Sequence, residues 1–339
     1  MSDPAAPTPE RIFQTTNAFQ SSAALEGAVE LGLFTALGGE SRTAASLAEA
    51  IGAAERGVRI LCDFLSIGGL LEKEGMEYRS APDAAMFLDE SSPAYMGPVV
   101  SFLLAPDLAG NYADIAGLVR RGGTLLEGDG TMEPDNPLWV DFARAMVPLM
   151  HPSAEFIGEL VTKDADPEAP FKVLDIAAGH GIFGIQIATR HPRAEIVALD
   201  SPGVLEVAAE NAGRFGVSDR HTRLPGSAFD VELGNGYDVV LLTNFFHHFD
   251  IPTCTDLMRK VRGALNPGGR AVTLEFVPNE DRVTPPEQAS FSLVMLATTP
   301  SGDAYTFDQY EGMFREAGFE KSELHRLQGP PQSVIVSTK

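Results

Sequence analysis

Residues 172–184 read Lys-Val-Leu-Asp-Ile-Ala-Ala-Gly-His-Gly-Ile-Phe-Gly, and this stretch decides the fold. An apolar run ends in Asp175. Glycines follow at Gly179, Gly181 and Gly184, where a helical pattern begins. A strand, a glycine-rich loop and a helix in this order let a ligand lie against bare backbone at a helix N-terminus. The spacing also fits the dinucleotide fingerprint G-x-G-x-x-G, which alone is a weak signal.

Two acidic residues make the ligand prediction more specific. The carboxylate of Asp175 suits the cationic amino-acid end of S-adenosylmethionine better than it suits a pyrophosphate. A second apolar run, residues 194–200, ends in Asp200, where an acid commonly binds ribose hydroxyls. The alternative is that both acids only cap helices. We therefore predict S-adenosylmethionine as cofactor, bound in part by Asp175, Gly179, Gly181 and Asp200.

From residue 166 to residue 339, strand and helix patterns alternate, which predicts a parallel sheet covered on both faces. A closing hairpin, 322–327 and 333–337, follows the parallel strands and is unusual for nicotinamide enzymes. The fold class is therefore α/β, with a Rossmann-like sheet and a closing antiparallel hairpin. The expected parallel strands are 173–177, 196–200, 221–224, 237–243 and 270–277.

Residues 1–92 show helix, helix and hairpin patterns typical of a winged helix. The second of these helices, 55–67, carries only Arg56 and Arg59, beside Glu55 and Asp63. Such a face binds phosphates poorly, and the formal net charge of −22 disfavours nucleic acid and anionic membranes as partners. We expect this mostly helical module to pack against another protein surface.

Other features of the sequence are those of a cytoplasmic protein. Cys62 and Cys254 lie far apart within helical patterns, so we expect buried thiols and neither a disulfide framework nor a metal site. We recognise no signal peptide in the first 20 residues and no run of about 18 apolar residues that would span a membrane.

Residues 93–165 are predicted to form a helical linker that contributes to a substrate pocket. Methionines and aromatics together are typical of adaptable pockets for flat apolar ligands, although they are also ordinary core residues. The expected pocket residues come from this segment and from a later helical stretch, 286–297: Trp139, Phe142, Met146, Met150, Phe291 and Met295.

Ligands of open α/β sheets bind beyond the carboxyl ends of the strands. At the fourth strand end His247 is the candidate general base, and Glu275 at the fifth is its partner. The alternative is a buried histidine that bonds only backbone. A metal site of His247, His248 and Asp250 is disfavoured because adjacent side chains diverge. The role of His180 is left open. Further candidate cofactor residues at strand ends are Ser227, Ala228, Phe229, Thr243 and Asn244.

With these residues assembled, the chain resembles the small-molecule O-methyltransferases of the plant caffeate, bacterial polyketide and acetylserotonin type. The resemblance spans nearly the whole length and includes residues 174–181, Leu199-Asp200 and 242–250. His247 falls on the family's catalytic histidine in L-K-x-x-L-H-D-W, and Glu275 on a glutamate that flanks it. The resemblance implies a Rossmann-like domain that binds S-adenosylmethionine and a homodimer in which N-terminal helices interlock.

The sequence departs from the family pattern at several positions. Two glycines of the cofactor loop are replaced by Ala177 and Ala178, and a second glutamate beside the base is replaced by Ala304. The last change leaves the base with fewer partners. The remaining departures are Ser227 for an acid, Thr243 for a lysine, and His248 and Phe249 for an aspartate and a tryptophan.

The leading hypothesis is O-methylation of a small hydroxylated aromatic or polyketide-like acceptor, with no nucleic acid or membrane partner. N- or C-methylation stays open. So does a relative that keeps S-adenosylmethionine but performs hydroxylation, decarboxylation or cyclisation. A nicotinamide dehydrogenase is disfavoured by Asp175 and the closing hairpin. A winged-helix regulator is disfavoured by the acidic charge.

Overall fold

The computed structural model describes residues 7–132 and 136–339. The chain forms two compact units, Met1–Ala109 and Gly110–Lys339. The segment 93–165, predicted as one helical linker, is divided between these units.

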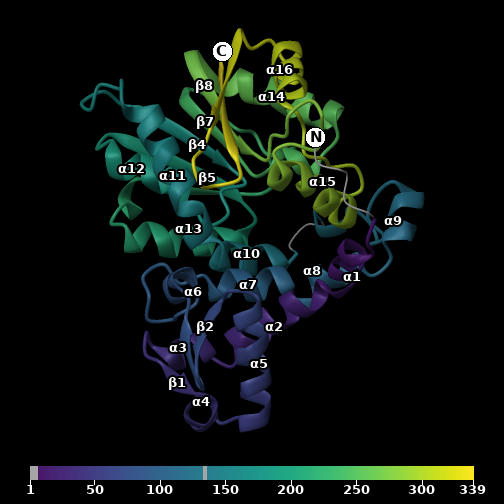
Figure 1. Cartoon of the computed structure of the whole chain (residues 1–339). Coiled ribbons are helices and arrows are strands. Elements are labelled where there is room, and N and C mark those ends of the chain that lie inside the picture. The colour runs from purple at the N-terminus through teal and green to yellow at the C-terminus, as the bar shows by residue number, and fades with distance from the viewer. Residues whose placement is uncertain (1–6, 133–135) are drawn as a thin grey trace, which may run out of the picture. The chain divides into compact units, whose positions relative to one another are not determined.

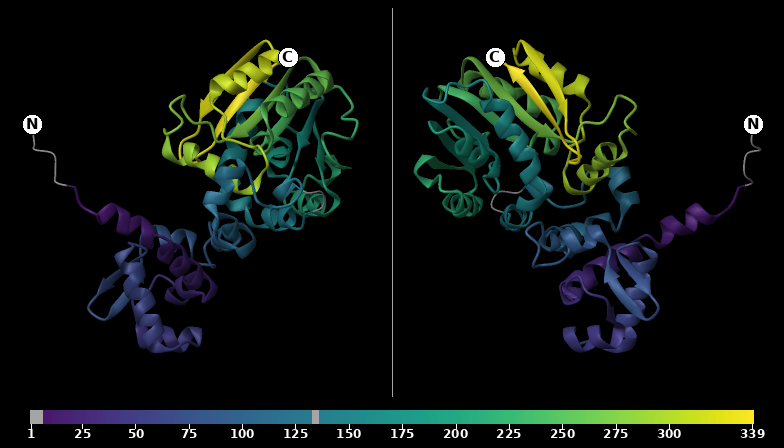
Figure 2. Two further views of the ribbon diagram at one scale, coloured as in Figure 1. Left: turned by 90° about the vertical axis from the view of Figure 1, so that its right-hand side faces the viewer. Right: turned by 60° about the vertical axis from the view of Figure 1, so that its left-hand side comes forward.

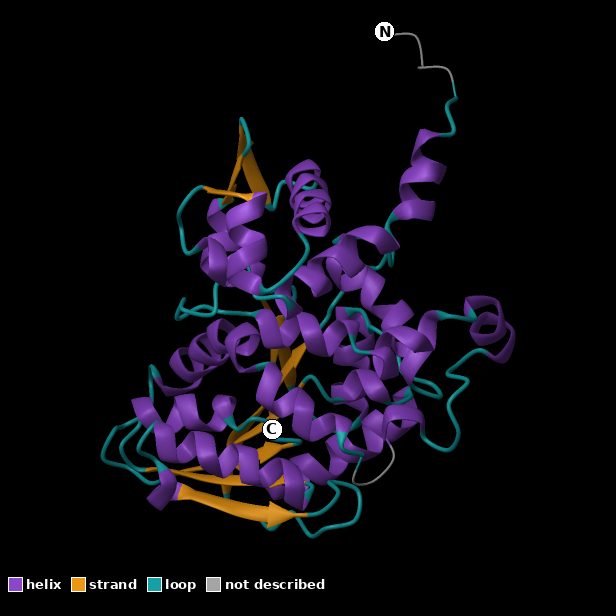
Figure 3. Cartoon of the chain, turned by 90° about the horizontal axis from the view of Figure 1, so that it is seen from below, coloured by secondary structure: helices purple, strands orange, loops and turns teal. Residues whose placement is uncertain are grey.

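The N-terminal unit combines helices with a three-stranded antiparallel sheet in the order β1-β3-β2 (Figure 3). The Thr43 hydroxyl caps α4 by accepting the Ser46 N–H at 3.3 Å, as expected for an N-cap residue. One face of α5 is buried through Val58, Cys62 and Leu65. The elements are α1 (Glu10–Asn17), α2 (Phe19–Glu30), α3 (Leu33–Leu37), β1 (Arg42–Thr43), α4 (Ala44–Ile51), α5 (Glu55–Ile67), β2 (Leu71–Glu74), β3 (Glu77–Ser80), α6 (Pro82–Phe87), α7 (Gly97–Leu104) and α8 (Pro106–Ala109).

The long helical pattern from residue 11 to residue 37 is interrupted twice in the structure. The first break lies between α1 and α2 at Ala18. The second lies at Gly32, whose φ of 63° is left-handed and is adopted by glycine without a steric penalty. Helical spacing of apolar residues continues across both breaks, so periodicity alone does not locate them.

The C-terminal unit is built on a seven-stranded sheet in the order β6-β5-β4-β7-β8-β10-β9. The strands β4 to β8 are parallel, and β10 runs antiparallel between β8 and β9. Figure 1 shows α11, α12 and α13 on one face of this sheet and α14 and α16 on the other. Figure 2 shows the C-terminal hairpin, in yellow, at one edge of the sheet. The predicted α/β class and closing hairpin are therefore confirmed.

The elements of this unit follow the predicted alternation closely, with most bounds displaced by one or two residues. They are η1 (Gly110–Tyr112), α9 (Ile115–Arg121), η2 (Gly130–Met132), α10 (Leu138–Ala145), α11 (Val147–Thr162), β4 (Phe171–Ile176), α12 (Ile182–Arg190), β5 (Ala194–Asp200), α13 (Pro202–Arg214), η3 (Ser218–Arg220), β6 (His221–Pro225), β7 (Tyr237–Thr243), η4 (Phe246–His248), α14 (Ile251–Ala264), β8 (Leu265–Glu275), α15 (Pro286–Thr298), α16 (Phe307–Glu316), β9 (Lys321–Arg326) and β10 (Ser333–Thr338).

The helical pattern from residue 136 to residue 161 is two helices in the structure, α10 and α11. They meet at Met146, and Pro148 stands at the start of α11. Proline lacks a backbone N–H and is tolerated in the first turn of a helix, so it permits a new helix to begin here. Among the described residues, no helix is both long and apolar enough to cross a membrane.

Candidate active site

The sheet reverses its direction of growth at β4, and this point fixes the position of the site. From β4 the chain adds β5 and β6 on one side and then β7 and β8 on the other. The crevice at such a switch point is where open α/β sheets bind ligands. The first residue after each of the two central strands, Ala177 and Asn244, has a left-handed backbone with φ of 52° and 51°. Such conformations are uncommon for residues other than glycine and cluster at functional sites.

A cavity of about 910 Å³ opens at this crevice. Strand ends, the glycine loop and the segment around α10 form its wall. Of the predicted site residues, the cavity wall includes Trp139, Phe142, Gly179, Asp200, Ser227, Ala228, Phe229, Thr243 and Asn244. The predicted residues outside the wall are Met146, Met150, Asp175, Gly181, His247, Glu275, Phe291 and Met295.

Asp200 organises the backbone at the glycine loop. Its Oδ2 accepts the Gly179 N–H at 2.9 Å and its Oδ1 accepts the Ser201 N–H at 2.7 Å. Burial raises the pKa of Asp200, while these two N–H bonds act in the opposite direction. A side chain added at Gly179 would meet almost nothing nearby, so the bare backbone faces open space.

Asp175 is placed differently from the prediction. Its side chain is fully buried, and its Oδ2 accepts the Gly184 N–H at 3.1 Å from the first turn of α12. Burial raises the pKa of Asp175 to about 8. Its Oδ1 is buried without a hydrogen-bond partner among the described residues, and Asp175 does not line the cavity. Because alternate residues of a strand point to opposite faces, the end of β4 directs Asp175 toward α12 and away from the cavity.

The second and third glycines of the loop serve close packing. A Cβ at Gly181 would lie 3.0 Å from the Ala208 Cβ of α13. A Cβ at Gly184 would lie 2.6 Å from the Ile196 Cγ2 of β5. Both distances are shorter than ordinary van der Waals contact, so the two glycines let the loop and α12 pack closely against α13 and β5. Gly181, predicted to contact the ligand, does not line the cavity.

His180, whose role the sequence left open, is a buried residue of the cavity wall. Its Nδ1 accepts the Ile182 N–H at 3.2 Å. A ring nitrogen that accepts a hydrogen bond carries no proton, so this contact places the proton on Nε2. Burial lowers the pKa of His180 to about 4, which keeps the ring neutral at physiological pH.

Aromatic rings close the end of the cavity after the third parallel strand. Phe229 packs edge-to-face on Phe249 with ring centroids 4.9 Å apart, and Phe245 lies 6.2 Å from Phe229. The loop that carries Phe229 is held by Lys260, a residue that the sequence did not single out. Its ammonium donates to the carbonyls of Ala228, Phe229 and Val231 at 2.9, 3.1 and 2.6 Å.

The predicted base and its partner are joined directly. His247 Nδ1 lies 2.5 Å from Glu275 Oε2. The second oxygen of Glu275 accepts the N–H groups of Phe245 and Phe246 at 3.0 and 2.8 Å. One carboxylate therefore holds both the backbone and the ring of the segment after β7. With the Nδ1 proton directed at a carboxylate, Nε2 is left as a proton acceptor.

His248 and Asp250 do not assemble a metal site with His247. Asp250 caps α14 by accepting the Thr253 N–H at 2.8 Å. The His248 ring packs edge-to-face on Trp139 at 5.4 Å. Burial, with a smaller effect from His247, lowers the pKa of His248. Within residues 7–132 and 136–339, no three His, Cys, Asp or Glu side chains are arranged to hold a metal ion.

The predicted pocket residues fall into two groups. Trp139 and Phe142 line the cavity and pack edge-to-face at 5.5 Å. Met150 is buried outside the cavity wall, where its sulfur accepts the Asn244 Nδ2 at 3.5 Å. Met146 and Met295 are likewise buried and lie outside the wall. Phe291 contacts the ring of His247 at a centroid distance of 4.9 Å.

The wall of the cavity fits a cationic nucleoside such as S-adenosylmethionine. Asn244 Oδ1 is buried in this wall without a hydrogen-bond partner among the described residues, which leaves an acceptor for a ligand N–H. Four carboxylates and, among the described lining residues, no lysine or arginine surround the space, so a positive charge is favoured there. The four acids are Asp129, Asp200, Asp230 and Asp250.

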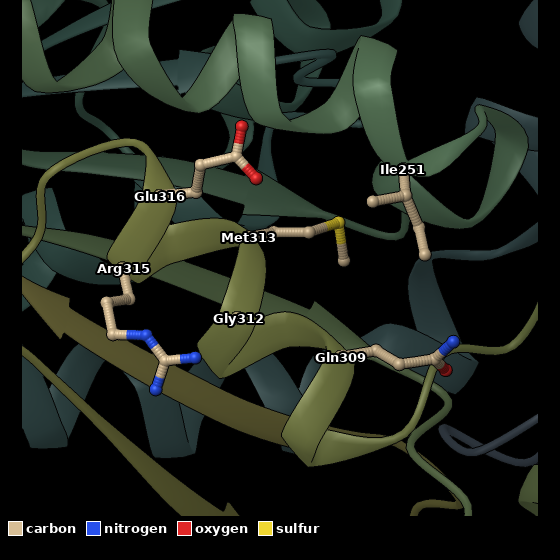
Figure 4. Close-up of a pocket in the computed structure, with 6 residues that line it drawn as sticks. All are labelled: Ile251, Gln309, Gly312, Met313, Arg315 and Glu316. Carbon is tan, nitrogen blue, oxygen red and sulfur yellow. The ribbon is translucent and has the colours of Figure 1, made fainter.

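A second, smaller cavity of about 460 Å³ lies beside α16 (Figure 4). It is lined by Ile251 of α14 and by residues of α16, including Arg315 and Glu316. Glu316 already accepts the Arg259 guanidinium at 2.6 Å. Because none of the residues of this wall is a predicted site residue, the cavity at the sheet switch point is the candidate active site.

Comparison with known proteins shows the family to which the chain belongs. A family profile described as the O-methyltransferase domain matches residues 140–320, which is more than half of the chain. A second profile, described as the O-methyltransferase dimerisation domain, matches residues 13–90. The chain is also similar to TcmO of Streptomyces glaucescens, the tetracenomycin polyketide synthesis 8-O-methyl transferase. The two are 27% identical over 333 residues, which is 96% of each chain.

Solved structures show the same fold over the full length. An O-methyltransferase candidate from Nostoc punctiforme is 49% identical with a TM-score of 0.95, and the match covers 98% of this chain and all of the other. Human N-acetylserotonin methyltransferase in complex with S-adenosylmethionine has a TM-score of 0.83 over 99% of both chains. At 21% identity, this second likeness shows the fold alone.

The profile match and the conserved architecture exclude the dehydrogenase and regulator alternatives as descriptions of the whole chain. The chain belongs to the O-methyltransferase family, whose methyl donor is S-adenosylmethionine.

Proposed function

We propose that this protein methylates an oxygen atom of a small hydroxylated aromatic acceptor, with His247 as the general base. The observation that carries this proposal is the 2.5 Å contact between His247 Nδ1 and Glu275 Oε2. A phenol has an unperturbed pKa of about 10, so a base must accept its proton near neutral pH. S-adenosylmethionine, when bound, supplies an electrophilic methyl group.

In this proposal Glu275 sets the tautomer of the base. Its carboxylate accepts a hydrogen bond from His247 Nδ1–H, which leaves Nε2 free to take the acceptor's proton. The same carboxylate then stabilises the imidazolium cation that forms. The position of the second family glutamate is filled by Ala304, a fully buried residue. The single carboxylate of Glu275 therefore supports the base.

The proposed cofactor site is the part of the cavity formed by residues 177–180, Asp200 and 226–230, which we call the cofactor end. Asp200 would bind the ribose hydroxyls, and Phe229 would stack on the adenine. Asn244 Oδ1 would accept a hydrogen bond from the amino-acid end of the ligand. His180 would also bind the cofactor, because its Nε2–H is a neutral hydrogen-bond donor suited to the carboxylate of the ligand. Asp175 and Gly181 would act indirectly, by holding the glycine loop.

The N-terminal unit supports a homodimer. Its sequence matches a dimerisation domain, and α1 and α2 expose Ile12, Phe13 and Phe19 with 69%, 62% and 68% of their surfaces accessible. Large apolar side chains gathered on adjacent helices are typical of surfaces covered by a partner. We propose that a second copy of this chain covers them.

The proposal is tested with purified protein, S-adenosylmethionine labelled on its methyl group, and a panel of phenols, anilines and carbon nucleophiles. We expect label in an aryl methyl ether, with one S-adenosylhomocysteine formed per ether. Label in an N-methyl or C-methyl product would replace the oxygen assignment. Conversion of an acceptor without S-adenosylhomocysteine would favour the alternative in which the cofactor is bound for other chemistry.

A further inference from the structure

Two stacked phenylalanine rings lie against the proposed base. Phe276 follows Glu275 directly at the end of β8, and Phe291 stands on α15. Their rings are nearly parallel, with an interplanar angle of 10° and a centroid distance of 3.8 Å. The His247 imidazole meets Phe291 edge-to-face at 4.9 Å and Phe276 at 6.4 Å. Phe276 belonged to none of the predicted site residues.

This arrangement covers the imidazole. His247 is only 4% exposed and does not line the cavity that the cofactor end opens into. A general base must come within about 2.6–3.2 Å of the proton that it takes. An acceptor ring that brings its hydroxyl to His247 therefore needs space that an aromatic side chain now fills.

The two rings differ in how firmly they are held. Phe276 continues from a central strand, next to the carboxylate that anchors His247 and the backbone after β7. Phe291 is carried by α15, which is outside the sheet and packs on α9 and η1. Its half-buried ring has no comparable anchor, and a change of side-chain rotamer moves it without moving the helix.

We propose that Phe276 is the platform on which the aromatic acceptor stacks and that Phe291 occupies the acceptor's place until it arrives. This inference rests on the proposed function, because it assigns the acceptor-binding residues of that same site. Offset or parallel stacking of a flat ring on Phe276 reproduces the contact that Phe291 makes. The acceptor class that fits is a flat, uncharged aromatic ring system, since the neighbouring cavity is acidic and disfavours carboxylated phenols.

The test uses 2-naphthol as probe and measures its binding calorimetrically to the full chain saturated with S-adenosylhomocysteine. Removing the competing ring in Phe291→Ala is expected to tighten binding about three- to tenfold. Removing the platform in Phe276→Leu is expected to weaken it by a similar factor. Leu293→Ala, on the same helix and 47% exposed, is the matched control and should leave affinity unchanged.

The affinity for S-adenosylhomocysteine must stay within about twofold in all variants, which shows that each one is folded. Weaker binding to Phe291→Ala, or equal binding to Phe276→Leu and the native chain, would overturn the inference. So would absence of binding to every variant. Methylation of 2-naphthol is measured separately. Binding that follows the expected order, with no aryl ether from 2-naphthol or from any phenol of the panel, would reject the proposed function while leaving the stacking site in place.

Discussion

At the cofactor end the cavity wall consists largely of backbone, which is held in place by hydrogen bonds to a carboxylate and an ammonium group. The space beside this wall is open. Around His247, by contrast, aromatic side chains surround the imidazole and fill the space beside it. Asp200 and Lys260 illustrate the first arrangement, with five hydrogen bonds to loop N–H and carbonyl groups. Phe276 and Phe291 illustrate the second. A cofactor common to a whole family suits a rigid, preformed site, whereas an acceptor that differs between members suits exchangeable side chains.

The largest expected effect separates the two regions by their kinetic roles. His247→Ala should lower kcat by about 10²- to 10⁴-fold, because a general base contributes roughly that factor. S-adenosylhomocysteine affinity should stay within about threefold, since His247 is outside the cavity wall. Steady-state kinetics and calorimetry measure the two quantities.

His248→Ala is the matched control for that variant. His248 lines the cavity and contacts Trp139, but no carboxylate orients its ring among the described contacts. We expect a smaller loss of kcat than for His247→Ala. If His248→Ala abolished turnover while His247→Ala kept it, the base would be His248.

For the cofactor end, the expected effect is on how the free energy of unfolding depends on pH below neutrality. The folded pKa of His180 is lowered to about 4, whereas an unfolded histidine titrates near its ordinary value of about 6.5. As pH falls from about 6.5 to 4, His180 becomes protonated in the unfolded chain but stays neutral in the folded chain. The free energy of unfolding therefore decreases over this range. The loss approaches about 3 kcal/mol. His180→Asn keeps an acceptor for the Ile182 N–H and should lose less stability over this range.

The measurement is the free energy of unfolding of both chains in denaturant between pH 8 and pH 4. The two proteins share every other titrating group, so the difference between their curves isolates His180. Parallel curves over the whole range would show that the ring protonates freely in the folded protein. His180 would then not be the neutral donor proposed for the cofactor end.

How much the sequence predicts also differs between the two regions. At the cofactor end, the position of a residue along the chain nearly determines its place. Asp200 ends a parallel strand, and Gly179 and Phe229 follow two others; such strand ends meet at one edge of the sheet. Asp175 was predicted as a direct clamp, but its side chain lies on the other face of the strand, toward α12, and does not line the cavity.

Around His247 the sequence predicts the residues but not their contacts. The pairing of His247 with Glu275 was expected from adjacent strand ends and is present. The stack of Phe276 on Phe291 joins two elements through an intervening loop, and no spacing rule relates them. Similarly, Met146 and Met150 were chosen for their type, and packing of α11 buried them outside the cavity.

A smaller effect is expected for Asp200→Ala. The change removes the proposed ribose contact and leaves the N–H groups of Gly179 and Ser201 without their acceptor. Hydrogen bonds to charged groups contribute about 1.5–3 kcal/mol, so S-adenosylmethionine should bind roughly 10- to 100-fold more weakly. At saturating cofactor, kcat should change little. Unchanged affinity by calorimetry would show that Asp200 does not bind the cofactor. If kcat fell by the same factor as the affinity, the cofactor end and the region around His247 would not have separate kinetic roles.

The smallest effect concerns the backbone of the cofactor end. Ala177 has a φ of 52°, a left-handed conformation that costs an L-residue about 1–2 kcal/mol relative to glycine. Ala177→Gly relieves this strain but makes the unfolded chain more flexible, which costs about 0.4–1 kcal/mol. The expected net gain in stability is about 0.5 kcal/mol.

Ala178→Gly is the natural control for this last change, because the neighbouring residue is buried and is not among the described residues with a left-handed backbone. It packs with Ala198 and Leu205, so losing its methyl group should destabilise the fold by about 1 kcal/mol. Thermal unfolding of the two variants should therefore shift in opposite directions. A shift in the same direction would show that Ala177 is not strained and that the rigidity of the cofactor end comes from its hydrogen bonds alone.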